Sequence, residues 1–280
     1  MNIRISVNEY ENEKAHMLAY ANVVIEDKYV LENVKIKSGQ SGRYVELPKI
    51  ATPKTDENKK VITNIYGRVE YDYQDIFHAI SKDANKQFYE AVLTEYKNVI
   101  ENGGSKAYYA NCEQGKKGSE HTIDGDFNLT RVTGGVHDAN REDDYLRGLA
   151  TVGFGEFVLE KVKIKANREN GNLYIDLPKY KTIAKDEKGK KLSDENGNQL
   201  YDYKEAFHPI TVEAYNELNN AVIQMYNEKL AQKQAESLAV DNGVNINTDL
   251  IPDNAPPQMD ITPEGIPLDF DDLEQTGGRK

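Results

Sequence analysis

Short stretches of the chain alternate hydrophobic and polar residues, the pattern typical of β-strands with one buried face. Residues 29–37 and 43–49 follow it, residues 18–26 form an earlier strand, and glycine-bearing turns separate the strands. A weaker leading strand is expected around residues 3–7. In the stretch 29–37, the pattern places Val30, Val34 and Ile36 on the buried face and Tyr29, Lys35 and Lys37 on the outward face.

A hydrophobic period of three to four residues follows these strands and predicts an amphipathic helix. Ser81 is placed to cap its N-terminus, and Asp83 lies in the first turn, where a carboxylate favours the helix dipole. Gly103 ends the pattern. The unit is therefore predicted to be an α+β domain, a small antiparallel sheet with a C-terminal helix. The periodic positions are Phe88, Val92, Tyr96 and Val99.

The whole pattern returns about 130 residues later, which indicates a duplicated domain. YVLENVKIK at 29–37 becomes FVLEKVKIK at 157–165 with seven of nine residues identical, and YDYQDIFHAIS at 71–81 becomes YDYKEAFHPIT at 201–211. This period is far too long for a solenoid. We expect the two copies to pack on each other as an intramolecular pseudo-dimer. The predicted segments are repeat 1 (1–102), a linker (103–126), repeat 2 (127–232) and a tail (233–280).

Composition agrees with two small domains and a tail. A chain of 280 residues has room for two domains of about 100 residues, and the mean hydropathy of −0.73 predicts small cores. We find no apolar run near the ~20 residues that a membrane span needs and no hydrophobic region of a signal peptide. The single cysteine, Cys112, cannot form an internal disulfide, which agrees with a reducing compartment. A cytoplasmic location is expected.

The net charge of −12 is concentrated in the tail. Residues 231–280 hold three basic and ten acidic side chains, whereas the other 230 residues hold 32 basic and 37 acidic ones. A nearly balanced body argues against strong non-specific DNA binding, because that binding comes from neutralising phosphates. It leaves room for a local basic face.

The sequence offers no catalytic motif of the serine-hydrolase, P-loop, zinc-protease or CxxC type. His78 and His208 are the only histidines that recur between the copies, and each precedes the helix, where a structural role is expected. The repeat supplies no further ligands for a metal ion around them. We therefore predict no enzymatic activity, no cofactor and no metal.

The ordered set of strand, glycine turn, aromatic-V-x-L-P segment, basic loop, H-x-I and helix resembles the SpoVG (septation / stage V sporulation protein G) family. His208-Pro209-Ile210 matches the family string, and repeat 1 has His78-Ala79-Ile80. The resemblance covers residues 1–101 and 127–230. It implies a sheet plus a helix, dimerisation, and regulatory nucleic-acid binding. The family is normally a single domain that pairs with a second chain, so the tandem favours pairing within one chain. The family lacks this tail.

Lysines on the outward strand face, near tyrosines, are the predicted nucleic-acid-binding residues. Lysine neutralises phosphates, and tyrosine stacks on the bases of single strands. The resemblance adds two lysines of the first helix, Lys82 and Lys86. Their counterparts in repeat 2, Val212 and Asn216, are uncharged, so we expect the two repeats to divide their roles. A merely solvated lysine surface remains the alternative. The candidates are Lys35, Lys37, Tyr44, Lys49, Lys82 and Lys86 in repeat 1 and Lys163, Lys165, Tyr174, Lys179 and Lys181 in repeat 2.

The tail is expected to be disordered, since PDNAPP at 252–257 disfavours regular structure. Its distal part sets hydrophobic residues among carboxylates and resembles the acidic tips of single-stranded DNA-binding proteins, which recruit replication and repair proteins. The chain continues to Lys280, so the terminal aromatic of those tips is missing. A solubilising tail that folds back on the basic face is the alternative. The candidate partner-binding residues are Ile266, Leu268, Phe270 and Leu273.

Two functions follow from these features. The first is a non-enzymatic protein that binds DNA or RNA, with single strands favoured, in regulation, septation or sporulation control, or mobile-element DNA metabolism. The second is a protein-interaction module, phage- or plasmid-encoded, that binds a protein partner instead.

Overall fold

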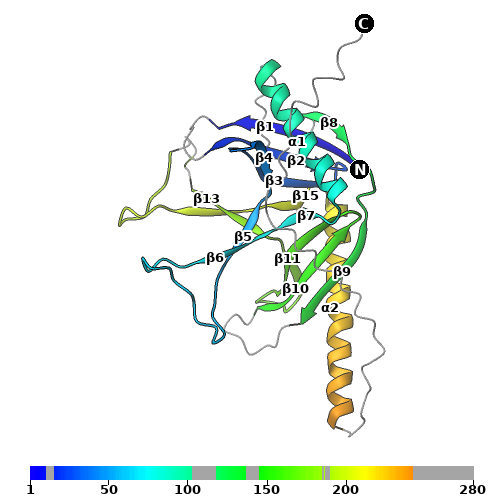
Figure 1. Cartoon of the computed structure of the whole chain (residues 1–280). Helices are drawn as coiled ribbons and strands as arrows, with labels where there is room; N and C mark the ends of the chain where they lie inside the picture. Colours follow the sequence, from blue (N-terminus) through cyan, green and yellow to red (C-terminus); the bar gives the residue numbers. More distant parts are fainter. Residues whose placement is uncertain (11–15, 103–117, 137–144, 185, 187–189, 242–280) are drawn as a thin grey trace.

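The chain forms two antiparallel sheets, each with one helix packed on it, around a shared hydrophobic core (Figure 1). The structure is a computed structural model that describes all residues except 11–15, 103–117, 137–144, 185, 187–189 and 242–280. The predicted α+β architecture of two similar units is confirmed. Repeat 1 contributes to the first sheet the strands β1 (Asn2–Glu9), β2 (Met17–Ile25), β3 (Tyr29–Gly39) and β4 (Gly42–Glu46). Repeat 2 contributes to the second sheet the strands β9 (Leu129–Val136), β10 (Leu146–Phe154), β11 (Phe157–Ala166) and β12 (Leu173–Asp176).

The helices begin where the sequence places them. α1 spans Lys82–Asn102 and α2 spans Val212–Asp241. The Ser81 hydroxyl accepts a hydrogen bond from the Ala84 amide at 3.2 Å, and the Thr211 hydroxyl accepts one from the Ala214 amide at 3.1 Å, so both predicted N-caps are confirmed. α1 packs on β1 and β4, and α2 packs on β9 and β12, so each helix covers one face of its own sheet.

The second helix is longer than predicted. It continues to Asp241, so the expectation of disorder is wrong for residues 233–241. This stretch, KQAESLAVD, is rich in good helix formers, whose propensity outweighed the acidic, polar composition of the tail.

A β-bulge corrects the predicted faces of the long strand in each repeat. Ala21 pairs with Val34 and Val23 pairs with Leu31, so β3 carries one extra residue, and Asn33 adopts a φ of 61°. The bulge shifts the alternation, so that Tyr29 is buried (2% exposed) and Val30 is only half-buried, the reverse of the prediction. β11 has the same bulge at Lys161 (φ 61°), with the same reversal at Phe157 and Val158.

Each repeat donates one short strand to the sheet of the other. β7 (Phe77–Ala79) of repeat 1 pairs with β11, and β15 (Phe207–Pro209) of repeat 2 pairs with β3. The far half of β3 pairs with β4, so a single edge of β3 is covered by both repeats. Covering that edge removes open backbone donors and acceptors. The predicted internal pseudo-dimer is therefore confirmed, and its mode of association is strand exchange.

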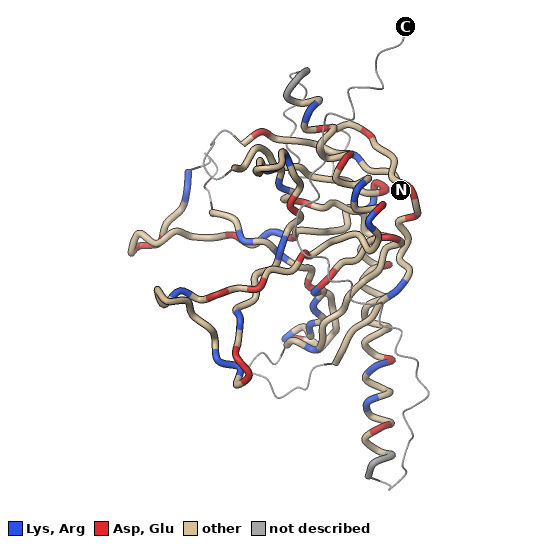
Figure 2. The backbone as a smooth tube through the Cα atoms, viewed as in Figure 1, with Lys and Arg blue, Asp and Glu red and all other residues tan. Residues whose placement is uncertain are grey.

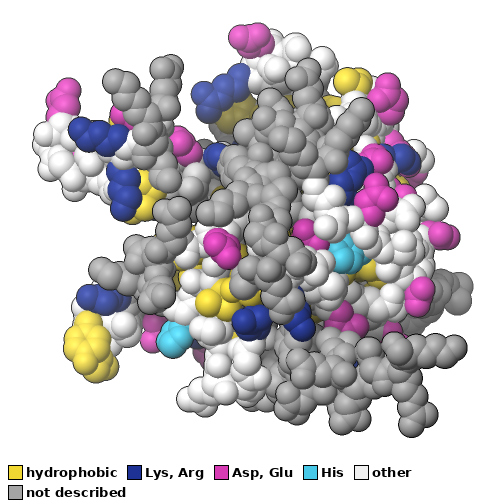
Figure 3. Space-filling view, turned by 90° about the horizontal axis from the view of Figure 1, so that it is seen from above, with side chains coloured by type: hydrophobic (Ala, Val, Ile, Leu, Met, Phe, Trp, Pro, Cys, Tyr) yellow, Lys and Arg dark blue, Asp and Glu magenta, His cyan; other side chains and the backbone are white. Residues whose placement is uncertain are grey.

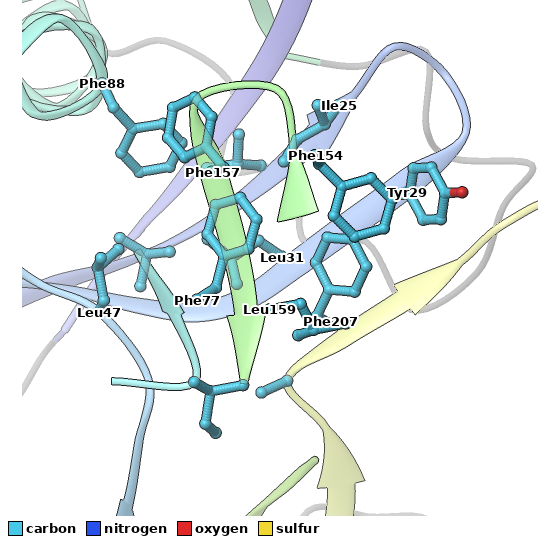
Figure 4. Packing of buried hydrophobic residues seen from close by; sticks show 14 of the residues in the cluster. Ile25, Tyr29, Leu31, Leu47, Phe77, Phe88, Phe154, Phe157, Leu159 and Phe207 are labelled. Carbon is cyan, nitrogen blue, oxygen red and sulfur yellow. The ribbon is translucent and has the colours of Figure 1, made fainter. Parts of the chain in front are cut away.

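Four aromatic rings stack through the contact between the repeats (Figure 4). Tyr29, Phe207, Phe77 and Phe157 follow one another with ring centroids 5.2, 5.4 and 5.3 Å apart and interplanar angles of 19°, 14° and 7°. The two middle rings come from the exchanged strands and are 0–1% exposed. Because the rings alternate between repeats, neither repeat completes this core alone.

The predicted basic loops form two arms that project from the body (Figure 1). Arm 1 (residues 49–75) is the ribbon of β5 (Lys49–Pro53) and β6 (Tyr71–Asp75), and arm 2 (residues 179–205) is that of β13 (Lys179–Ile183) and β14 (Tyr201–Glu205). At the fork of arm 1, backbone hydrogen bonds of 2.8–3.0 Å join residues 54, 62 and 70 in a ring, and residues 184, 192 and 200 repeat it in arm 2. The fork of each arm is thus held together by backbone hydrogen bonds.

Part of the predicted linker belongs to the first sheet. β8 (Ser119–Thr122) pairs with β1, and the Ile123 amide donates to the Met1 carbonyl at 2.9 Å. No helix among the described residues is long and apolar enough to cross a membrane.

Candidate nucleic-acid interface

The predicted lysines of repeat 1 lie on the outer sheet face beside a carboxylate. The Nζ atoms of Lys35 and Lys37 lie 3.3 and 2.8 Å from the two oxygens of Glu46. Burial by itself raises the pKa of Glu46, but the hydrogen bonds and charges of the two lysines outweigh burial and hold the pKa below its ordinary value. Tyr44 stands opposite Lys37 in the strand register. Two cations and one carboxylate leave this face with little net positive charge.

Repeat 2 gathers four of its predicted residues on the corresponding face. Asp176 lies between Lys165 and Lys179, at 2.8 and 2.7 Å, and the register sets Lys163 opposite Asp176 and Tyr174 opposite Lys165. Burial raises the pKa of Asp176, but its bonds to the two lysines prevail and lower it. Asp176 therefore binds two lysines, and a third lies opposite it in the strand register, beside an exposed tyrosine.

A shallow hollow of about 560 Å³ opens next to this group. We call it the repeat 2 hollow; it is lined by Tyr145, Lys165, Ala166, Asn167, Arg168, Glu169 and Tyr174. The Arg168 guanidinium lies 4.2 Å from the centroid of the Tyr145 ring, a cation–π contact. Cations and aromatic faces thus meet at one open site, the combination that single-stranded nucleic acids require.

Tyr145 and Arg168 are not among the binding residues that the sequence predicts. Arg168 lies in the glycine turn after β11 and Tyr145 just precedes β10, so no local pattern joins them; only the pairing of the two strands does. By alignment of the same strands, repeat 1 has His16 and Gln40 at these positions. The richer surface therefore belongs to repeat 2.

The structure separates the helix lysines from the strand lysines. Lys82 and Lys86 are exposed on α1, and the Lys86 ammonium lies 3.7 Å from Glu90. α1 packs on the inner face of the first sheet, whereas Lys35 and Lys37 lie on the outer face. One strand of nucleic acid cannot lie on both groups without passing around the sheet edge.

The remaining predicted lysines lie at the base of the arms. Lys49 is 3.8 Å from Asp75 in arm 1, and Lys181 of arm 2 places its ammonium 3.6 Å from the centroid of the Tyr201 ring. Further tyrosines that the prediction did not include stand exposed on both arms: Tyr71, Tyr73, Tyr201 and Tyr203.

Charges of both signs alternate along the described chain (Figure 2), and lysine and arginine mix with aspartate and glutamate on the face in Figure 3. This distribution agrees with the nearly balanced body. Positive charge therefore gathers in local groups such as the one in repeat 2.

Each recurring histidine lies in an exchanged strand, near a half-buried carboxylate. Burial raises the pKa of Asp75 near His78 and of Glu205 near His208, and the neighbouring cations only partly offset it. The described residues contain no group of three potential ligands that could hold a metal ion. Cys112 and the tail candidates Ile266, Leu268, Phe270 and Leu273 lie outside the described residues.

Comparison with known proteins matches the SpoVG family model twice, at residues 1–98 and 131–228. Similar proteins described as septation protein SpoVG occur in Caldanaerobacter subterraneus subsp. tengcongensis (26% identical over 95 residues), Heliobacterium modesticaldum (30% over 89) and Borreliella afzelii (31% over 94). The matches cover 32–34% of this chain and 80–87% of each relative, so a relative is about the size of one repeat. No solved structure matches.

These descriptions name no enzymatic activity. The two family matches fall on the two units that exchange strands and share one core. The chain therefore belongs to the SpoVG family and contains two SpoVG units in tandem.

Proposed function

We propose that this chain is a non-enzymatic nucleic-acid-binding protein that holds a single strand of DNA or RNA on the outer sheet face of repeat 2. The observation that carries the proposal is the meeting of Lys163, Lys165 and Lys179 with the repeat 2 hollow, where Tyr145 and Tyr174 offer aromatic faces. In the cell, we propose a regulatory role connected with septation, because the similar proteins carry that description.

The ion pairs of this face favour binding. Asp176 holds Lys165 and Lys179 in place, and partly exposed pairs of this kind stabilise a fold by only about 0–1 kcal/mol. A phosphate can therefore replace the carboxylate at small cost. The lysines are positioned before the ligand arrives, which reduces the entropy lost on binding.

The experiment is a fluorescence-anisotropy titration of labelled single- and double-stranded DNA and RNA at several salt concentrations. The double variant Lys163→Gln/Lys165→Gln is expected to flatten the log–log salt slope for single strands by about 1.4, since each neutralised phosphate contributes about 0.7. Lys35→Gln/Lys37→Gln, at the matching positions of repeat 1, is the control and should change the slope less. Equal slopes in the wild type and the repeat 2 variant would refute this location.

We also propose that the acidic tail competes with nucleic acid and carries a docking segment for a replication or repair protein. The tail holds ten carboxylates and three cations and is tethered beside local lysine clusters. Such a composition suits a segment that competes with phosphates for these lysines. Tethering gives such a segment a millimolar effective concentration when the linker is short and flexible. The candidate docking residues are Ile266, Leu268, Phe270 and Leu273.

A protein-interaction module remains the second candidate, and the tip of arm 1 favours it. Ile65 and Tyr66 are 91% and 79% exposed there, and repeat 2 has Glu195 and Asn196 at the matching positions. Such exposure suits insertion into a protein pocket. Failure of the chain to bind any oligonucleotide, with a partner lost on Tyr66→Ala, would favour this function.

A further inference from the structure

We propose that arm 2 is a second contact site for the same strand, in which Tyr201 and Tyr203 stack on bases of an extended single strand while Lys181 meets its phosphates. This inference rests on the proposed function and adds residues that the sheet face does not include. It concerns single strands alone.

The ribbon of arm 2 places these three side chains on one face. Lys181 pairs with Tyr203 across the ribbon, Ile183 pairs with Tyr201, and alternate residues of a strand share a face. The Lys181 ammonium lies 3.6 Å from the centroid of the Tyr201 ring. Tyr201 and Tyr203 are 45% and 65% exposed. The Lys181 ammonium occupies one face of the Tyr201 ring, so a base would stack on the remaining exposed ring surface.

The opposite face of the same strand is held against the body. The Tyr180 hydroxyl donates a hydrogen bond of 2.9 Å to Glu32 of repeat 1, and the Tyr180 ring packs on the core. Because Tyr180 alternates with Lys179 and Lys181, these lysines lie on the other face of β13. Contact with the body therefore fixes the direction in which the tyrosine face of the arm points.

This arm face is continuous with the proposed site. Lys179 shares the face with Lys181 and reaches Asp176, which also holds Lys165 at the repeat 2 hollow. Glu205 pairs with Lys179 and lies on the same face. A strand that lies on the hollow therefore meets lysines interspersed with Asp176 and Glu205 on its way to the arm, which projects from the body (Figure 1).

The spacing of the tyrosines selects an extended strand. Residues two apart in a β-strand are separated by about 6.8 Å, and the rings of Tyr71 and Tyr73, their counterparts in arm 1, are 6.5 Å apart. Stacked bases rise by about 3.4 Å along one strand. Successive bases can each meet a tyrosine only if the strand is stretched and unstacked, which a duplex does not allow.

Arm 1 provides a natural comparison. It keeps the two tyrosines, but Ala51 stands where arm 2 has Lys181, and Lys49 at its base lies beside Asp75. Arm 1 therefore offers the two rings without a lysine beside them on the same face of the ribbon. Its contribution to binding is expected to be smaller.

The chain contains no tryptophan, so Tyr203→Trp introduces a unique indole at the proposed site. Its fluorescence is expected to be quenched by oligothymidylate, because a stacked base contacts the indole directly. Leu238→Trp is the control and should not be quenched. Leu238 is 63% exposed and belongs to the last turn of α2, and this end of the helix lies away from the arms (Figure 1).

Affinity for the same oligonucleotide is measured in the full chain. Tyr203→Ala is expected to weaken binding about 5-fold or more, with little change in salt slope, whereas Tyr203→Phe should bind like the wild type. Tyr73→Ala, its counterpart in arm 1, should have the smaller effect. Rescue by phenylalanine separates stacking from a hydroxyl contact, and a far-ultraviolet circular dichroism melt checks that each variant is folded.

The outcomes separate the inference from the function on which it rests. If Lys163→Gln/Lys165→Gln alters the salt slope but Tyr203→Ala binds normally and Tyr203→Trp is not quenched, the arm site is wrong and the function stands. If no oligonucleotide binds at all, both are wrong. Loss of a protein partner with unchanged oligonucleotide affinity would reassign the arm to protein docking and overturn the inference.

Discussion

Replacing Phe77 by alanine tests whether the two repeats form a single cooperative structure. The ring is 1% exposed, stacks on Phe207 at 5.4 Å and Phe157 at 5.3 Å, and comes from an exchanged strand. Removing a buried phenylalanine typically costs 3–5 kcal/mol, from lost transfer energy and the remaining cavity. A domain of ordinary stability has about 5–15 kcal/mol in total, so Phe77→Leu is the milder companion variant.

The assay is urea unfolding followed by far-ultraviolet circular dichroism, with extrapolation to water. We expect a single transition in the wild type, since the ring stack alternates between repeats, and a drop of about 3–5 kcal/mol in the free energy of unfolding for Phe77→Ala. Tyr73→Ala, four residues away on the exposed arm (66% exposed), is the control and should change stability by about 0.5 kcal/mol or less. A double-mutant cycle with Phe207→Ala should give a coupling energy of about 0.5–1.5 kcal/mol.

Two results would refute this reasoning. One is a wild type that unfolds in two steps of which Phe77→Ala shifts only one, since the repeats would then have independent cores. The other is a loss of stability no larger than that of Tyr73→Ala, since the ring stack would then contribute little.

Three further predictions concern the halves, pH and the tail. Separately expressed residues 1–124 and 125–241 should self-associate or be unstable by light scattering, because each lacks its partner's strand; two stable monomers would contradict strand exchange. A carboxylate with a lowered folded pKa stabilises the fold above its unfolded pKa and loses this effect as pH falls, so Asp176→Asn should cost stability at neutral pH but not in strong acid. Glu205 has a raised pKa, so its ionised form destabilises the fold at neutral pH, and Glu205→Gln should raise the melting temperature there. If the stability of the two variants changed with pH in the same way, the opposite pKa shifts of Asp176 and Glu205 would be wrong. Deleting residues 242–280 should tighten single-strand binding, most at low salt where screening is weak, and equal affinity at every salt concentration would leave the tail a solubilising extension.

Local signals in the sequence determined the elements and their order. The cap residues Ser81 and Thr211, the helical spacing and the strand alternation each act within a few residues, so they could be predicted without knowledge of the partner surfaces. The repetition at 130 residues also determined that there are two similar units, because duplicated sequences fold alike. The family resemblance, in which single domains pair, added the expectation that the two units pair.

Only the tertiary structure decided which side chains of β3 are buried and which sheet each exchanged strand joins. The positive φ at Asn33 shifts the alternation of β3, and a pattern of period two cannot show one inserted residue. The segment Phe77–Ala79 has the same local sequence whether it pairs with its own sheet or the other; the free edge of β11 and the ring stack select the second.

The candidate site divides in the same way. Lys163, Lys165 and Tyr174 recur in register with repeat 1, so the sequence could place them on one face of a sheet. Tyr145 and Arg168 come from separate turns and meet only because β10 and β11 pair antiparallel. Contacts within one element leave a period in the sequence, whereas contacts between elements depend on register and packing, which no local pattern records.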